Sequence, residues 1–322
     1  MHRSITVARS RADAAWQRCR RLKRGSRAWI SVALLLFLCP MVEVARAACP
    51  PASWTRTALQ ELKERSFAIE DPTARFALAE ALIGCLSSPS AELRDGVAYE
   101  ALQHWMRAGA FGPERLRMLE KRLRTMLDGR DRHGVARPFA ALVLAEIART
   151  DRVSPWMTAE ERAAMVERAA AYLESVRDYR GFDRDVGWRH GVAHGADWLM
   201  QLALNPNIGK PELDRIIRAI AEQAVPRDAH AYVFGESERL ARPLLFVAMR
   251  GLHEEAEWGA WFEDLRGRLG EPGLAYRDTA WLARRHDLWM LLSALHIEVS
   301  RSEGAAIAKL RPALLAALQA LP

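Results

Sequence analysis

The sequence predicts an all-α fold of stacked helical pairs, either a HEAT-like solenoid or an irregular helical bundle. From residue 54 onward apolar residues recur with the 3.6-residue period of a helix, and no convincing alternating run of strand type interrupts them. The connections between these segments are short, and no linker rich in Pro, Gly or Ser divides the chain. We therefore expect a single all-α domain over residues 48–322.

Capping signals and prolines locate the individual helices. Thr158-Ala159-Glu160-Glu161 has the pattern of a capping box, with Thr at the cap and Glu three residues later. Four prolines stand where a first-turn proline is tolerated, at the head of a new periodic segment: Pro113, Pro138, Pro211 and Pro312. The expected helices cover residues 54–66, 73–86, 91–108, 113–128, 137–149, 159–177, 187–204, 211–224, 237–252, 255–268, 278–298 and 305–320.

The turns at residues 71–75 and 88–94 are similar to turns that open helices in HEAT-type solenoids. No exact period repeats along the chain, so the turns support stacked helix pairs only weakly. Both architectures therefore stay open.

The first 47 residues have the organisation of a secretory signal. A basic stretch ending at Arg27 leads into an apolar run over residues 28–39, and Ala45-Arg46-Ala47 offers small residues at the −3 and −1 positions. The apolar run is shorter than the roughly 20 residues that span a bilayer. We expect a cleaved signal peptide and an exported, periplasmic protein. The alternative is an uncleaved inner-membrane anchor through residues 28–42.

The formal charge of +7 comes from this leader. Residues 1–47 hold ten of the 47 basic residues and two of the 40 acidic ones, which leaves 37 against 38, a net charge of −1, for residues 48–322. A nearly neutral domain has no electrostatic footprint for nucleic acid. We expect contact with a membrane only through the N-terminal segment, and the sequence does not identify a protein or small-molecule partner.

Two cysteines remain after the leader, Cys49 and Cys85, and an even pair in an oxidising compartment is a disulfide candidate. If the helices expected at 54–66 and 73–86 form an antiparallel hairpin, the end of the second returns beside the start of the first. The alternative is two unpaired thiols.

One segment carries a narrow polar stripe on an apolar helix. With about 100° per residue, His190, His194, Asp197 and Gln201 fall within roughly 60° of one another, and the other positions up to residue 204 are apolar or Gly. Such a helix is expected to be buried on most sides. The stripe must then find partners, because an unpaired buried polar group costs on the order of 1–3 kcal/mol. Two glycines of this helix, at 191 and 195, predict close approach of another helix or a ligand.

Three interpretations of the stripe remain open. His190, His194 and Asp197 could bind a catalytic Zn²⁺ or another divalent metal, although no HExxH motif supplies a general base. Alternatively, one His acts as an acid or base oriented by Asp197, with Trp188 and Trp198 as apolar walls. In the third interpretation the stripe is a satisfied hydrogen-bond network that fixes helix register. The other candidates for a pocket around the stripe are Arg180, Gln201, Glu238 and Arg239.

These patterns predict an exported helical scaffold that binds a ligand or partner around residues 180–198. The alternative is a hydrolase or lyase of the cell envelope, metal-dependent or His-based, that uses His190, His194 and Asp197. A purely structural interaction module is the third option.

The same segment resembles the central signature of a bacterial family, domain-of-unknown-function family 2785. The residues that carry the resemblance are Arg180-Gly181-Phe182, Gly187-Trp188, His190, Ala193-His194 and Asp197. Looser support comes from Glu92-Leu93-Arg94-Asp95, Arg137-Pro138-Phe139 and Glu238-Arg239-Leu240. The resemblance extends from about residue 65 to 300. It implies an all-helical fold and carries over neither an activity nor a catalytic residue.

Overall fold

The structure, a computed structural model, describes residues 49–322, so the expected leader and the alternative anchor lie outside the described residues. The described residues form one compact unit with its own apolar core, which is the property of a part that folds by itself. Within the part of the chain that the structure describes, no helix is both long and apolar enough to cross a membrane.

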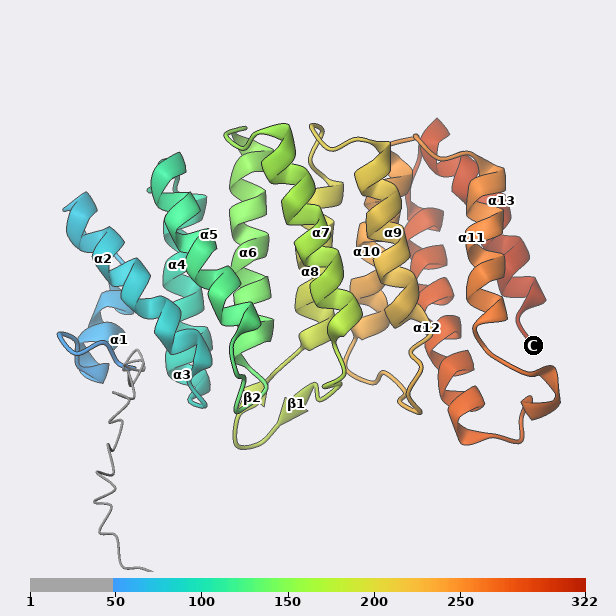
Figure 1. Ribbon diagram of the computed structural model, residues 1–322, viewed down its shortest axis with the longest axis horizontal. Helices are drawn as coiled ribbons and strands as arrows, with labels where there is room; N and C mark the ends of the chain where they lie inside the picture. The colour runs from blue at the N-terminus through green and yellow to red at the C-terminus, as the bar shows by residue number, and fades with distance from the viewer. Residues whose placement is uncertain (1–48) are drawn as a thin grey trace, which may run out of the picture. The chain divides into compact units, whose positions relative to one another are not determined.

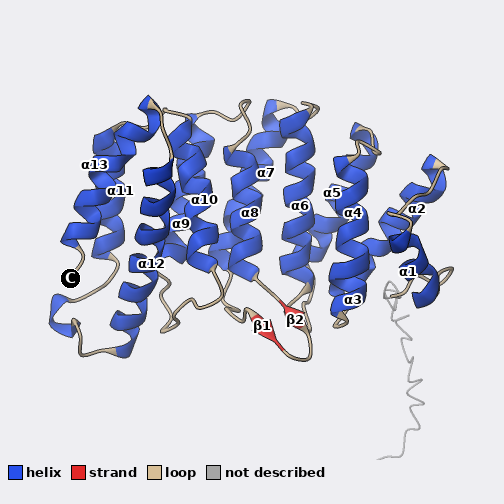
Figure 2. Cartoon of the chain, turned by 180° about the vertical axis from the view of Figure 1, so that it is seen from behind, coloured by secondary structure: helices blue, strands red, loops and turns tan. Residues whose placement is uncertain are grey.

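Nearly all of the regular structure is helical, which confirms the all-α prediction (Figures 1 and 2). Two short strands, β1 (Phe182–Asp183) and β2 (Gly187–Trp188), form an antiparallel hairpin. The α-helices are α1 Arg56–Glu64, α2 Pro72–Ile83, α3 Ala91–Leu93, α4 Glu100–Arg107, α5 Pro113–Asp128, α6 Ala136–Val153, α7 Ala159–Ser175, α8 Gly191–Ala203, α9 Lys210–Ala224, α10 Glu236–Met249, α11 Glu255–Gly267, α12 Thr279–Arg301 and α13 Ala305–Ala320. Two 3₁₀ turns, Gly84–Ser87 and Pro272–Leu274, and a π-helical turn, Arg94–Tyr99, complete the list.

The helices of residues 49–322 stack in two layers (Figure 1). In one layer α4, α6, α8, α10 and α12 pack side by side in chain order, so each contacts the next but one helix along the chain. In the other layer α7 packs on both α8 and α9, while α5 packs on α6. This pattern is that of stacked helical pairs rather than of an irregular bundle.

The capping box predicted at the start of the helix after residue 158 is present. The Thr158 hydroxyl accepts a hydrogen bond from the Glu161 N–H at 3.2 Å, and the Glu161 carboxylate accepts one from the Thr158 N–H at 2.8 Å. The capping box is thereby confirmed at the start of α7.

Two predictions of where a helix begins were wrong. A helix was expected from residue 187, but α8 begins at Gly191, because His190 takes a left-handed backbone conformation with φ 55° and Gly187 one with φ 78°. The residues before it pair as strands, with Phe182 opposite Trp188. Pro312 was expected at the head of a helix and lies inside α13 instead.

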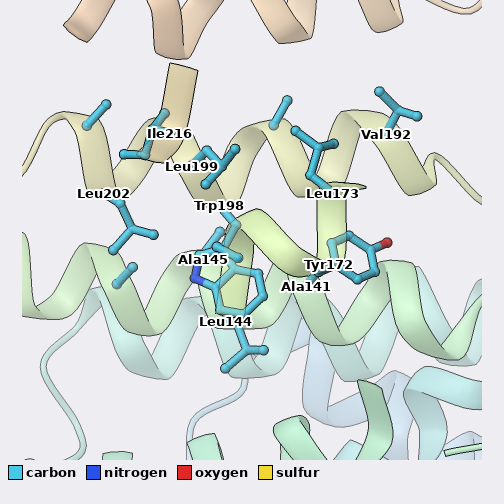
Figure 3. Packing of buried hydrophobic residues seen from close by; sticks show 14 of the residues in the cluster. Ala141, Leu144, Ala145, Tyr172, Leu173, Val192, Trp198, Leu199, Leu202 and Ile216 are labelled. Atoms are coloured by element: carbon cyan, nitrogen blue, oxygen red, sulfur yellow. The ribbon is translucent and has the colours of Figure 1, made fainter. Parts of the chain in front are cut away.

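Helix α8 is buried on most sides, as its composition predicts (Figure 3). Trp198 is fully buried and packs in the cluster that α6 and α7 share with α8. Gly195 faces α7, where an added Cβ would lie 3.0 Å from Leu173 and 3.1 Å from Tyr172. A methyl group there would push the two helices apart, so the glycine serves the approach of a helix.

In the structure Cys49 and Cys85 are joined by a disulfide, with a Cα–Cα distance of 5.0 Å. The bond ties the segment before α1 to the 3₁₀ turn after α2. It therefore closes the N-terminal end of the helix stack.

Candidate binding site

The polar stripe of α8 is tied to the helices on both sides of it. Both carboxylate oxygens of Asp197 accept hydrogen bonds from Arg239 of α10, whose Nε lies 2.8 Å from Oδ1 and whose Nη2 bonds Oδ2. On the other side, Gln201 Oε1 accepts a hydrogen bond from Arg152 Nε of α6 at 3.1 Å. Asp197 and Gln201, in the C-terminal half of α8, thus fix this helix between its neighbours α6 and α10.

His194 is buried against α6. Its Nδ1 lies 3.2 Å from the Pro138 carbonyl oxygen, and its ring meets the Phe139 ring edge-on, with centroids 5.1 Å apart. Burial, with smaller contributions from His190 and Arg239, lowers the pKa of His194 well below the ordinary value. The imidazole is neutral at pH 7, and Nδ1–H donates to the carbonyl.

His190 combines an unusual backbone with an aromatic stack. Its φ of 55° is costly for a residue other than Gly, and such strain concentrates at functional sites. The imidazole lies parallel to the Trp188 ring, with centroids 4.1 Å apart and an angle of 7°. Burial, and to a smaller extent the Arg239 charge, lowers its pKa to about 4. This side chain is also neutral at pH 7.

The geometry of the stripe does not suit a metal. Among residues 49–322, no group of three or more His, Cys, Asp and Glu side chains is arranged to hold a metal ion. The rings of His190 and His194 lie 5.7 Å apart and make separate contacts, and Arg239 occupies both oxygens of Asp197. The residues therefore do not fit the zinc site that the spacing suggests.

Exposed apolar side chains gather where the hairpin meets the loop before α10. We call Phe182, Trp188, Val233 and Phe234 the aromatic edge; their exposed fractions are 50%, 39%, 70% and 38%. The Phe182 and Phe234 rings both meet Trp188 at steep angles, with centroids 5.0 Å and 6.0 Å away. The three rings are contiguous, and Val233 directly precedes Phe234 in the chain, at the same end of the helix stack.

Two buried arginines hold the hairpin in place. Arg94, on the π-helical turn, is fully buried and donates to the carbonyl oxygens of Val186 at 2.9 Å and Trp188 at 3.3 Å. Arg189 donates from Nε to the His133 carbonyl oxygen at 3.0 Å. The two strands are short, but their position is fixed by residues from distant parts of the chain.

The structure brings together only part of the predicted pocket. Trp188, Gln201 and Arg239 join the stripe as described. Trp198 lies in the core and walls no pocket, since its indole has no exposed surface. Arg180 pairs with Asp178 on the exposed loop before β1. Glu238 is exposed on the first turn of α10 and makes no ion pair within the described part of the chain.

The sequence prediction missed Val233, Phe234 and Arg94 as parts of this site. A signal for the first two exists: Ala231-Tyr232-Val233-Phe234 is an apolar run in a connection between helices, directly before Gly235 starts the next one. No local signal identifies the role of Arg94, because its partners lie more than 90 residues away.

Comparison with known proteins places the chain in a family. The family model described as "Protein of unknown function (DUF2785)" matches residues 125–297, a span that contains the hairpin, the polar stripe, Phe234 and Arg239. The span is narrower than the expected 65–300, so Glu92-Leu93-Arg94-Asp95 lies before it. No curated protein and no solved structure matches the chain. Because the matched span covers more than half of the chain, the chain belongs to the family described as "Protein of unknown function (DUF2785)".

Proposed function

We propose that this chain is an exported, periplasmic helical scaffold that binds a partner through the aromatic edge. One observation carries the proposal: four exposed large apolar side chains lie together on two loops at one end of the stack. Single exposed apolar residues are ordinary, whereas contiguous apolar patches mark interaction sites. Trp in particular is enriched among residues that carry binding energy.

The contacts that hold the aromatic edge in place favour a binding role. Arg94 and Arg189 fix the hairpin before any partner arrives, and Gly181 lets the Phe234 ring lie against the backbone beside β1. A preformed surface loses little conformational entropy on association.

The polar stripe supports a structural role better than a catalytic one. Asp197 is paired with Arg239, and in residues 49–322 neither His190 nor His194 is hydrogen bonded to a carboxylate that would orient it as a general base. The stripe sets the position of α8 between α6 and α10. It thereby positions His190 and Trp188 at the head of that helix.

A photo-crosslinking amino acid placed at Phe182 tests the proposal in cells that express the full chain. We expect discrete crosslinked products, with a protein or with lipid, from this position. Trp289 on α12 is the matched control position, since it is 43% exposed and lies outside the aromatic edge. Equal products from both positions, or none from Phe182, would overturn the proposal. Fractionation of the same cells tests the export: the chain is expected in the periplasmic fraction without residues 1–47.

A further inference from the structure

Three loops meet at the end of the stack that carries the aromatic edge (Figure 1). Arg189 in the hairpin donates to the His133 carbonyl in the connection from α5 to α6. A Cβ added at Gly134 would lie 2.5 Å from the Asp178 carboxylate, and one added at Gly181 would lie 2.2 Å from the Phe234 ring. Residues 129–137, 177–190 and 226–235 therefore form one surface, which we call the loop edge.

The loop edge is basic, although the domain is not. It holds eight Arg against five Asp, a net charge of +3. The exposed Glu238, whose carboxylate would lie 3.5 Å from a Cβ added at Gly235, lowers this to +2, whereas residues 48–322 together carry −1. Several of the acids are already engaged: Asp178 pairs with Arg180, and Asp183 pairs with Arg189.

Three arginines of the loop edge are available to a partner. Arg130, Arg132 and Arg184 are exposed and, within the described part of the chain, make neither an ion pair nor a side-chain hydrogen bond. The first two lie beside His133, and the third lies in the turn between β1 and β2. The loop edge thus carries both exposed Trp and Phe side chains and three exposed guanidinium groups that have no acidic partner among residues 49–322.

We propose that the loop edge docks on an anionic lipid surface, an inference that rests on the proposed binding role of the aromatic edge. Trp and Phe partition into the interface between headgroups and acyl chains. Each Arg near an anionic surface adds about 1 kcal/mol of attraction. The four apolar side chains would enter the interface, and the three arginines would contact phosphate groups.

The inference goes beyond the expectation that only the N-terminal segment meets a membrane. The overall charge of −1 does not reveal this local excess of arginine, because 39 and 35 residues separate the three loops in the sequence. The fold collects their arginines at one end.

Cosedimentation with lipid vesicles tests the inference. Purified residues 48–322, the part that folds as one unit, are mixed with vesicles of phosphatidylcholine alone or with about one third phosphatidylglycerol. We expect binding to the anionic vesicles only, weakening as salt rises. Trp188→Ser with Phe234→Ser, and separately Arg130→Gln with Arg132→Gln, should each weaken binding by about tenfold or more.

Matched controls are Trp289→Ser and Arg242→Gln, which change exposed residues of α12 and α10 outside the loop edge and should bind as the unaltered protein does. Equal binding by all variants, or no binding to anionic vesicles at low salt, would overturn the lipid inference. If Phe182 crosslinks to a protein in cells while the vesicles stay unbound, the partner is a protein: the proposed function survives and the lipid surface does not.

Discussion

At Gly181 the absence of a side chain lets the Phe234 ring lie against the backbone beside β1. We predict that Gly181→Ala lowers the free energy of unfolding by about 1–3 kcal/mol, because the new Cβ would lie 2.2 Å from the ring and must displace it. Thermal denaturation measures the change. The control is Gly259→Ala inside α11, where nothing lies within 4 Å and a gain of up to about 1 kcal/mol is expected. An unchanged melting temperature for Gly181→Ala would contradict the packing.

The two stripe histidines should make the protein sensitive to acid. Their pKa values are lower in the folded protein, to about 4 for His190, than the value near 6.5 of an unfolded chain. Their contribution to stability is therefore complete above pH 6.5 and is lost as the pH falls toward 4. We expect the free energy of unfolding, measured by urea denaturation, to be lower at pH 5 than at pH 7 by about 1–2 kcal/mol per histidine. His190→Gln should reduce this difference; an identical pH profile in the variant would argue against it.

Asp287 on α12 should act in the opposite direction. It is buried, its Oδ1 accepts a hydrogen bond from the Tyr232 N–H at 2.8 Å, and its Oδ2 has no hydrogen-bond partner among residues 49–322. Burial, with a smaller contribution from Glu236, raises its pKa to about 7. The folded protein therefore favours the neutral carboxyl group. Its contribution to stability is complete below pH 3.8, the pKa of the unfolded chain, and is lost as the pH rises through 7.

We therefore predict that Asp287→Asn raises the free energy of unfolding by about 1–3 kcal/mol at pH 8 and changes little at pH 4. Urea denaturation at the two pH values measures this. The exposed Asp185→Asn is the control, with little change at either pH. Destabilisation by Asp287→Asn at pH 8 would show that the carboxylate is needed.

The hairpin depends on one side chain from another element. Arg94→Met would remove the buried guanidinium group that donates to the partly buried carbonyl groups of Val186 and Trp188. We expect a loss of about 3 kcal/mol or more and faster hydrogen exchange over residues 182–189. The control Arg152→Met removes one hydrogen bond to Gln201 and should leave exchange in the hairpin unchanged. Unchanged, slow hydrogen exchange over the hairpin in Arg94→Met would show that the hairpin is stable without the arginine.

The elements differ in how far their own sequence determines them. The helix at 113–128 is found at the expected residues, since it has a first-turn proline and a regular apolar period. The hairpin was not predicted, because two-residue strands have no alternating pattern and depend on Arg94 and on left-handed backbone at Gly187 and His190. The polar stripe follows from helical spacing, whereas the aromatic edge joins residues about 50 positions apart and needs the tertiary fold.

At the scale of the whole domain, the disulfide links Cys49 to Cys85 across a sequence separation of 36 residues. We predict that Cys49→Ser with Cys85→Ser lowers the free energy of unfolding by up to about 4 kcal/mol, mainly through a less restricted unfolded chain. Denaturation with and without reductant measures it, and reduced unaltered protein should match the variant. Two alkylatable thiols in unreduced, secreted protein would contradict the bond.

The first and last helices of the stack are held in different ways, so we expect unfolding to begin at one particular end. In a stack of helical pairs each unit is held chiefly by its neighbours, so separation begins at an end. A disulfide holds the first helices, whereas only noncovalent contacts hold α13 on α10, α11 and α12. These contacts include the Lys309–Glu254 ion pair and hydrogen bonds from Arg311 to the carbonyl oxygens of Val299 and Ser302. Under a protease or a pulling force, the chain should therefore release its C-terminal pairs first. Partly degraded molecules would still present the loop edge.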